Sequence, residues 1–213
     1  ERPKTLVFGF TPYLPADQLR KEFSPLVEYV GAKIGIPTEL RIASSYSELV
    51  RMIVNDEVHI AQLSPFNYVR AKAESPGLVL LATHIADGSA TYSSYIVTRE
   101  DSGITTIDQL RGKNFGFVDR QSCSGYLYPL AYLRGLGIEP ERFFGTVQFV
   151  GNHTDLAKKV GDATLDAGAT FATIYKLAKD TPFRILAKAG RIPYDAYCAS
   201  STLDPNFVEK LRD

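Results

Sequence analysis

The sequence predicts an α/β protein whose sheets are mostly parallel. Short apolar segments typical of strands alternate with amphipathic segments typical of helices along all 213 residues, and this alternation indicates βαβ units. The same order of segments begins again after residues 95–98, which we interpret as a crossing between two halves of the chain. A chain of this length can form one large domain or two small ones.

The first half begins with a strand at 6–10 and a long helical segment at 19–34. Pro25 predicts a kink in that helix, or a restart capped by Ser24. Gly35 and Pro37 end it. Ser45 and Glu48 predict a capping box at the start of a second helix, and Ser64-Pro65 starts a third. Further strands are expected at 39–43, 59–63 and 78–84.

In the second half, Thr106 and Gln109 cap a short helix. Strands are expected at 114–118, 146–150 and 166–171, with helices at 126–136 and 154–160. The segment 183–189 leads back toward the first half through Ile192-Pro193, and Asp204-Pro205 opens a last helix at 206–212.

Composition excludes several classes of function. The chain has 24 Lys and Arg residues and 24 Asp and Glu residues, so basic residues are not in excess. A nucleic acid or an acidic membrane is therefore not expected as a partner. No apolar run approaches the ~20 residues of a membrane-spanning helix. Two cysteines are too few for a disulfide framework. No spacing of His, Cys, Asp and Glu supports a metal site, and no cofactor is expected.

The most informative segment is 114–126, where an apolar run ends in Ser122, Cys123, Ser124 and Gly125 before a helical pattern begins at Tyr126. The free N–H groups and positive dipole end of a helix start favour an anion. The hydroxyl and thiol groups would add donors, and Gly125 would let an anion approach the backbone. The alternative is an ordinary serine N-cap. Ser64-Pro65 repeats this arrangement in the first half.

Several spaced motifs resemble the phosphate/phosphite/phosphonate ABC-transporter periplasmic substrate-binding protein family. The motifs occur in the order found in the family, across nearly the whole chain. They are the segment 92–104, Asp108-Gln-Leu-Arg-Gly-Lys113, Phe117-Val-Asp, Ser122-Cys-Ser-Gly-Tyr126, Gly151-Asn-His153, Asp166-Ala-Gly168 and Ile192-Pro193 with Asp195.

The resemblance implies a two-lobed periplasmic-binding-protein fold of type II. Each lobe would be a mostly parallel sheet flanked by helices, with a ligand cleft between the lobes. The first lobe is expected to comprise 1–94 and 198–213, and the second 95–197, with crossing segments near 93–97 and 192–198. Family members usually continue with more helix after the region of Arg212, so the sequence is expected to be trimmed or cut from a longer protein.

The resemblance also implies a set of ligand contacts. The family motif Ser-Thr-Ser-Gly corresponds to 122–125, where Cys123 replaces a threonine. An acidic residue of members that bind an aminoalkyl phosphonate corresponds to Thr173, which argues against an amine-bearing ligand. His59 and His84 are expected to be structural. With Ser64 from the repeated arrangement, the expected ligand-binding residues are Ser122, Cys123, Ser124, Gly125, His153, Tyr92, Tyr46, Ser64 and Asp195.

The expected function is capture of phosphate, phosphite or a phosphonate by an extracytoplasmic monomer, which would deliver it to the membrane permease of an ABC transporter. Membrane anchoring stays open. A sensor domain joined to the transmembrane module of a receptor is the alternative. A third interpretation, an enzyme, would use Cys123 as nucleophile and His153 as base, but a binding site explains the same residues with fewer assumptions. Cys123 and Cys198 are not expected to form a disulfide.

Overall fold

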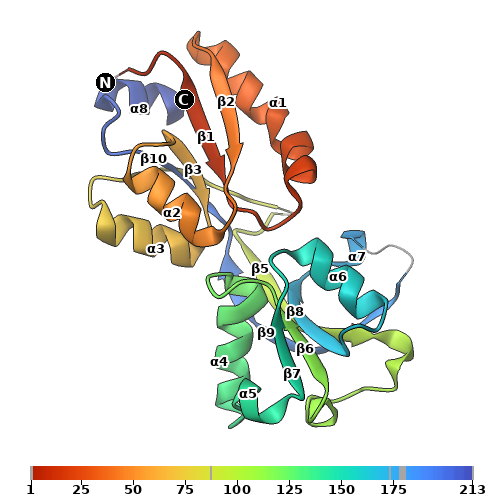
Figure 1. Cartoon of the computed structure of the whole chain (residues 1–213). Helices are drawn as coiled ribbons and strands as arrows, with labels where there is room; N and C mark the ends of the chain where they lie inside the picture. The colour runs from red at the N-terminus through yellow and green to blue at the C-terminus, as the bar shows by residue number, and fades with distance from the viewer. Residues whose placement is uncertain (1, 87, 173, 178–180, 213) are drawn as a thin grey trace. The chain divides into compact units, whose positions relative to one another are not determined.

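The computed structural model describes residues 2–86, 88–172, 174–177 and 181–212. The chain forms two compact units (Figure 1), of which unit 1 comprises Glu1–Ala90 with Tyr194–Asp213 and unit 2 comprises Thr91–Pro193. Each unit is built on its own five-stranded sheet. In the part of the chain that the structure describes, no helix is both long enough and apolar enough to cross a membrane.

The sheet of unit 1 has the strand order β2-β1-β3-β10-β4. Strands β1, β2 and β3 are parallel, whereas β10 runs antiparallel to both β3 and β4. The described elements of this unit are β1 (Leu6–Phe10), α1 (Ala16–Ile34), β2 (Thr38–Ile42), α2 (Tyr46–Val54), β3 (Ile60–Leu63), α3 (Pro65–Glu74), β4 (Val79–Thr83), β10 (Ala196–Ala199) and α8 (Pro205–Arg212).

Apolar residues on both faces of this sheet hold the helices in place. On one face, Leu49 and Ile53 of α2 and Ala71 of α3 pack with Leu63 of β3 in a buried cluster. Elsewhere in the unit, the ring of Phe10 on β1 stacks on Phe23 of α1 with 4.4 Å between the ring centroids. Burial of such side chains is the main favourable term in folding.

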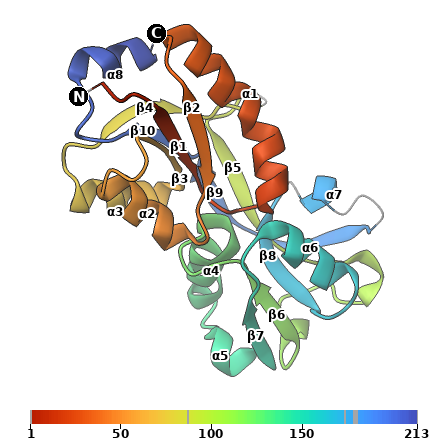
Figure 2. The same cartoon turned by 45° about the horizontal axis from the view of Figure 1, so that its top comes forward.

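The sheet of unit 2 has the order β7-β6-β8-β5-β9. Strands β6, β7 and β8 are parallel, and β5 is antiparallel to β8 and to the long strand β9 (Figure 2). The described elements are β5 (Thr91–Arg99), the 3₁₀ turns η1 (Glu100–Ser102) and η2 (Asp108–Leu110), β6 (Asn114–Phe117), the π-helical turn η3 (Cys123–Leu127), α4 (Tyr128–Gly135), α5 (Pro140–Phe143), β7 (Thr146–Phe149), α6 (His153–Gly161), β8 (Ala167–Phe171), α7 (Ile174–Leu177) and β9 (Phe183–Pro193).

The structure confirms the predicted α/β class and differs from the sequence prediction in some elements. Helix α1 continues through Pro25 instead of restarting there, and it ends at Gly35 in the left-handed conformation, whose N–H donates to the Gly31 carbonyl. Helical structure after β6 begins at Cys123 rather than at residue 126. Helix α5 and strand β10 were not predicted. The units divide at 90/91 and 193/194 rather than at 94/95 and 197/198, and β5 pairs with β9 over its whole length.

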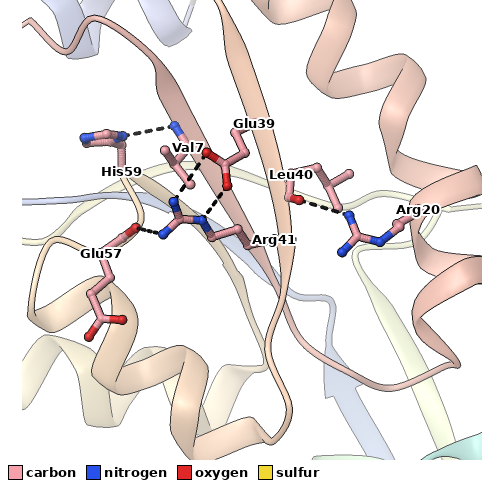
Figure 3. A network of polar contacts seen from close by, with 7 residues as sticks. All are labelled: Val7, Arg20, Glu39, Leu40, Arg41, Glu57 and His59. Carbon is pink, nitrogen blue, oxygen red and sulfur yellow. Dashed lines mark hydrogen bonds and ion pairs between the residues drawn. The ribbon is translucent and has the colours of Figure 1, made fainter.

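Polar groups on β2, the outer strand of unit 1, and on the segments beside it make the contacts drawn in Figure 3. Arg41 on β2 donates to the Glu39 carboxylate at 2.7 Å and to the Glu57 carbonyl at 3.0 Å. Nearby, the Nδ1 atom of His59 accepts a hydrogen bond from the Val7 N–H at 3.0 Å. This contact gives His59 the structural role that the sequence analysis predicted for it.

Candidate functional site

The predicted site residues of unit 2 lie at one edge of its sheet. Because β6, β7 and β8 are parallel, their carboxyl ends share an edge, which is where open α/β sheets bind ligands. Ser122 follows β6, His153 follows β7, and Phe171 ends β8. Strand β5 is antiparallel to β8 with Ser94 opposite Phe171, so Tyr92 lies near this edge as well.

The turn after β6 is held closed by its own hydrogen bonds. Ser122 is the N-cap, and its Oγ atom accepts a hydrogen bond from the Gly125 N–H at 3.0 Å. The Leu127 N–H donates to the Ser122 carbonyl, five residues back, which makes the turn π-helical. The Val118 N–H donates to the Gly125 carbonyl and joins the turn to the end of the strand. Single π-helical turns of this kind are frequent at functional sites.

Close packing requires a glycine at position 125, which the sequence alone does not indicate. A Cβ atom at this position would lie 2.5 Å from the Cβ atom of Val118 and 2.9 Å from the Ser122 Oγ atom. Contacts that short do not occur, so any side chain would push the turn away from the strand. The glycine therefore keeps the helix start close to β6, whatever it does for a ligand.

A buried line of three polar side chains leads from the turn into the unit. The Oγ atom of Ser124 lies 3.5 Å from Nε2 of His153, and Nδ1 of the same ring lies 2.9 Å from Oγ1 of Thr170. Ser124 is 3% exposed, His153 is 1% exposed and Thr170 is fully buried. Ser94, also fully buried, donates its hydroxyl to the Ser124 carbonyl at 2.9 Å. Buried polar groups of this kind are costly unless they are paired.

Burial lowers the pKa of His153 to about 3. The imidazole is therefore neutral in the protein without ligand at physiological pH. A neutral imidazole still has one N–H donor. If the Thr170 hydroxyl donates to Nδ1, the proton of the ring is on Nε2, directed toward Ser124. The ring can then donate to an anion without carrying a charge.

Aromatic contacts position Tyr92 within the same group of residues. The ring of His153 packs edge-on against Phe171 with 4.6 Å between centroids, and Phe171 packs edge-on against Tyr92 at 5.6 Å. At the start of α6, the Asn152 side chain caps the helix by accepting from the Asp155 N–H at 2.9 Å. His153 is thus the first residue of a capped helix, and its backbone N–H lies in the first turn.

The remaining predicted residues belong to unit 1 and gather at one edge of its sheet. Tyr46 starts α2 and is 3% exposed, while Ser64 caps α3 and is 5% exposed. Strand β10 runs antiparallel to β3 with Ala196 opposite Leu63. Asp195 therefore lies at the same edge as Ser64, and the structure brings these predicted residues of unit 1 to one edge.

Asp195 is a half-buried carboxyl group, and this burial raises its pKa to about 7. Two phenols lie near it. Burial is the main cause that raises the pKa of Tyr13. Smaller contributions in the same direction come from Glu22, Asp195, Tyr197 and Tyr46. Burial likewise raises the pKa of Tyr197, with Asp195 and Glu22 adding to the effect. A carboxyl group with this pKa carries a proton on a substantial fraction of molecules at neutral pH.

Both cysteines are buried, and neither takes part in a disulfide. Cys198 belongs to the apolar core of unit 1, where burial raises its pKa to about 12. Cys123 is 3% exposed within the π-helical turn. Among the described residues no group of His, Cys, Asp and Glu is arranged to hold a metal ion. Thr173, on which the expectation about amine-bearing ligands depended, lies outside the described residues.

Sequence analysis missed Thr170, Ser94 and Asn67. Thr170 and Ser94 are polar residues on strands β8 and β5 whose side chains are buried and bonded to other site residues. Asn67 is fully buried in the first turn of α3. A polar residue inside an otherwise apolar strand, as in Ala167–Phe171, is a signal that could have identified Thr170.

The chain matches the family of proteins described as "ABC transporter, phosphonate, periplasmic substrate-binding protein" over residues 8–213. The chain therefore belongs to this family of periplasmic binding components of ABC transporters.

Individual relatives agree with this assignment. The phosphate-import protein PhnD of Mycolicibacterium smegmatis is 26% identical over 226 residues, which cover 99% of this chain and 70% of the relative. A binding protein component of an ABC phosphonate transporter from Pseudomonas aeruginosa has the same fold, with a TM-score of 0.90 at 21% identity over 100% of this chain and 74% of the other.

A second solved structure, PhnD1 from Prochlorococcus marinus in complex with methylphosphonate, has a TM-score of 0.86 at 19% identity, covering 99% of this chain and 83% of the other. These structures confirm the predicted type II periplasmic-binding-protein fold.

Proposed function

We propose that this protein captures a phosphorus oxyanion, namely phosphate, phosphite or a phosphonate, and delivers it to the membrane permease of an ABC transporter. The observation that carries the proposal is the buried group of donors at the sheet edge of unit 2. The hydroxyl of Ser124, the Nε2 atom of His153 and the helix starts at Ser122 and Asn152 occur together there.

This arrangement can bind an anion through the dipoles of N–H groups and helix starts, without a positively charged side chain. The N–H groups in the first turn of a helix have no partner within the helix, and the helix dipole places partial positive charge there. In a site that excludes water, the effective dielectric constant is low and each dipole interacts more strongly with the ligand. Net charge is zero, so recognition by geometry rather than by a general positive field is consistent with the composition.

The ligand contacts that we propose in unit 1 are Tyr46, Ser64 and Asp195. Those that we propose in unit 2 are Ser122, Cys123, Ser124, Gly125, His153 and Tyr92. The ligand is compact, because Thr173 stands where relatives that bind an aminoalkyl phosphonate carry an acid. An unpaired buried ammonium group would cost several kcal/mol.

The proposed setting is extracytoplasmic, as the family description indicates, and the protein acts as a monomer with no nucleic acid partner. The sensor-domain alternative is less favoured, because the family match spans residues 8–213 and is to transporter components. Catalysis is not part of the proposal. The described hydrogen bonds of the His153 ring go to the hydroxyls of Ser124 and Thr170, as in a binding site oriented by hydroxyl groups.

Thermal unfolding of the protein with phosphate, phosphite, methylphosphonate, aminoethylphosphonate and sulfate tests the proposal. At 100 times its dissociation constant, a ligand that binds only the folded state adds about 2.7 kcal/mol to the unfolding free energy. At least one small phosphorus oxyanion should raise the melting temperature. If none does, the proposal fails. Release of a new product from any of them, followed by ³¹P NMR, would instead support an enzyme.

A further inference from the structure

We propose that Asn67 is a positioning residue that fixes the two helix starts of unit 1 relative to each other, and through them the ring of Tyr46 and the cap at Ser64. This inference rests on the proposed function, because it assigns Tyr46 and Ser64 to the ligand site. Asn67 itself is not assigned a contact with the ligand.

The contacts of Asn67 reach both helix starts. Its backbone N–H donates to the Oγ atom of Ser64 at 3.4 Å, which caps α3. Its side-chain Nδ2 atom donates at 3.0 Å to the carbonyl of Tyr46, the first residue of α2 and 21 residues away in the chain. One fully buried residue therefore joins the start of α3 to the start of α2.

The orientation of this side-chain amide follows from its partner. A backbone carbonyl can only accept a hydrogen bond, so the group that faces Tyr46 is the NH₂ and not the oxygen. The Oδ1 atom is consequently the remaining polar atom, and it is buried with no hydrogen-bond partner among the described residues.

A buried acceptor without a partner costs free energy. An apolar residue of similar size, such as leucine, would avoid that cost, and the carbonyl of Tyr46 would keep its bond within α2 because helix carbonyls accept from four residues ahead. Leucine would therefore remove an acceptor without a described partner and would also lose the hydrogen bond to the Tyr46 carbonyl. We attribute the presence of asparagine to the geometry that it imposes on α2.

The geometry matters at Tyr46 because of what its side chain approaches. Tyr46 is the first residue of α2, so its ring starts from the sheet edge at which Ser64 and Asp195 also lie. A small rotation of α2 about its start would move that ring relative to Asp195. The Asn67 contact opposes such a rotation, since it holds the first carbonyl of the helix.

The experiment compares Asn67→Leu with Ser200→Ala as a matched control. Ser200 is also a buried polar residue of unit 1, but its hydroxyl contacts Asp56 and its N–H donates to the His59 carbonyl, at the opposite end of β3 from Ser64. Unfolding free energy is measured by urea denaturation, and the dissociation constants for methylphosphonate, phosphite and phosphate are measured by calorimetry.

We expect Asn67→Leu to weaken binding roughly tenfold, which corresponds to about 1.4 kcal/mol, while its unfolding free energy stays close to that of the wild type. Ser200→Ala should lower stability and leave the dissociation constant unchanged. In a Tyr46→Phe background, Asn67→Leu should weaken binding less than about threefold, because coupled residues are not additive.

Unchanged affinity in Asn67→Leu would overturn the inference. A loss of affinity that is the same in the wild-type and Tyr46→Phe backgrounds would also overturn it, as would a Tyr46→Phe variant that binds like the wild type. If Asn67→Leu does not fold, Asn67→Ser replaces it in the same cycle and is judged by the same coupling. If the wild type binds none of the three oxyanions, the proposed function itself fails, and the inference fails with it.

Discussion

The Nε2 atom of His153 lies 3.5 Å from the Oγ atom of Ser124, and both residues are buried. These residues come from two different helix starts of unit 2, which follow the neighbouring strands β6 and β7. The contact therefore links the two helix starts that we propose as the anion-binding half of this unit. Whether Nε2 of His153 donates or accepts in this contact depends on which ring nitrogen carries the proton. The position of that proton depends in turn on the contact with Thr170.

Thr170→Val should weaken binding of the phosphorus oxyanion by about tenfold, or 1.4 kcal/mol. If the Thr170 hydroxyl donates to Nδ1 of His153, its replacement by a methyl group in valine lets the ring proton move from Nε2 to Nδ1 in part of the molecules. The Nε2 atom would then present a lone pair to the anion. Calorimetry measures the effect.

Thr170→Ser is the matched control, because it keeps the hydroxyl and removes only a methyl group. Equal dissociation constants for Thr170→Val and Thr170→Ser would show that the hydroxyl does not orient the ring.

Ser122→Ala should mainly lower the stability of the protein, whereas Ser124→Ala should mainly lower its affinity for the ligand. The Oγ atom of Ser122 accepts from the Gly125 N–H, so its loss removes a cap and costs about 1 kcal/mol of stability. The Oγ atom of Ser124 has no such capping bond among the described contacts and faces His153. Its loss should weaken ligand binding by roughly 1.5–3 kcal/mol, the range for a hydrogen bond to a charged group.

Urea denaturation and calorimetry on both serine variants separate the two effects. The prediction is wrong if Ser124→Ala binds as tightly as the wild type, or if it loses more stability than Ser122→Ala does.

The stability of the ligand-free protein should contain an acid-sensitive contribution from His153. Its pKa is about 3 in the folded state because of burial, against about 6.5 in the unfolded chain. Between these values the unfolded chain binds more protons, so the contribution is fully present above pH ~6.5 and decreases as the pH falls. The difference in unfolding free energy between wild type and His153→Gln should shrink from pH 7 to pH 5. A difference that is constant with pH would show that the pKa of the ring is the same in the folded and the unfolded protein.

Asp195 should make the ligand-free protein less stable as the pH rises, which is opposite to the effect of His153. Its pKa is about 7 in the folded state because of burial, against about 3.9 unfolded. The folded state therefore binds more protons between these values, and stability is lost as the pH rises toward and through 7. Asp195→Asn should stabilise the ligand-free protein by roughly 1–2 kcal/mol at pH 8, discounted for partial exposure. It should change stability little at pH 4. Equal gains at both pH values would mean that the carboxyl is not perturbed.

Much of the fold could be predicted from the sequence because the signals are local. Ser45, Ser64 and Gly35 mark helix ends in the sequence, and each occupies the predicted cap in the structure. At Pro25 the sequence predicted either a kink or a restart of the helix, and α1 does not restart there. A proline in a helix removes one hydrogen bond and strains the preceding turn, yet tertiary packing of residues such as Phe23 and Val27 outweighs that cost.

The interior of the site could not be predicted, because it depends on contacts between distant segments. Asn67 meets Tyr46 across 21 residues, and Ser94 meets Ser124 across 30. Nothing near Thr170 in the sequence indicates that its hydroxyl lies beside an imidazole 17 residues away. The neutral state of His153 likewise follows from burial, which only the folded chain establishes.

Titration calorimetry of the wild type with methylphosphonate, phosphite, phosphate and sulfate, repeated with Ser124→Ala, tests the central claim most directly. The account predicts binding of at least one of the three phosphorus oxyanions at one ligand per chain, with affinity reduced in Ser124→Ala. Binding of none of them by the wild type, or binding that Ser124→Ala leaves unchanged, would contradict it.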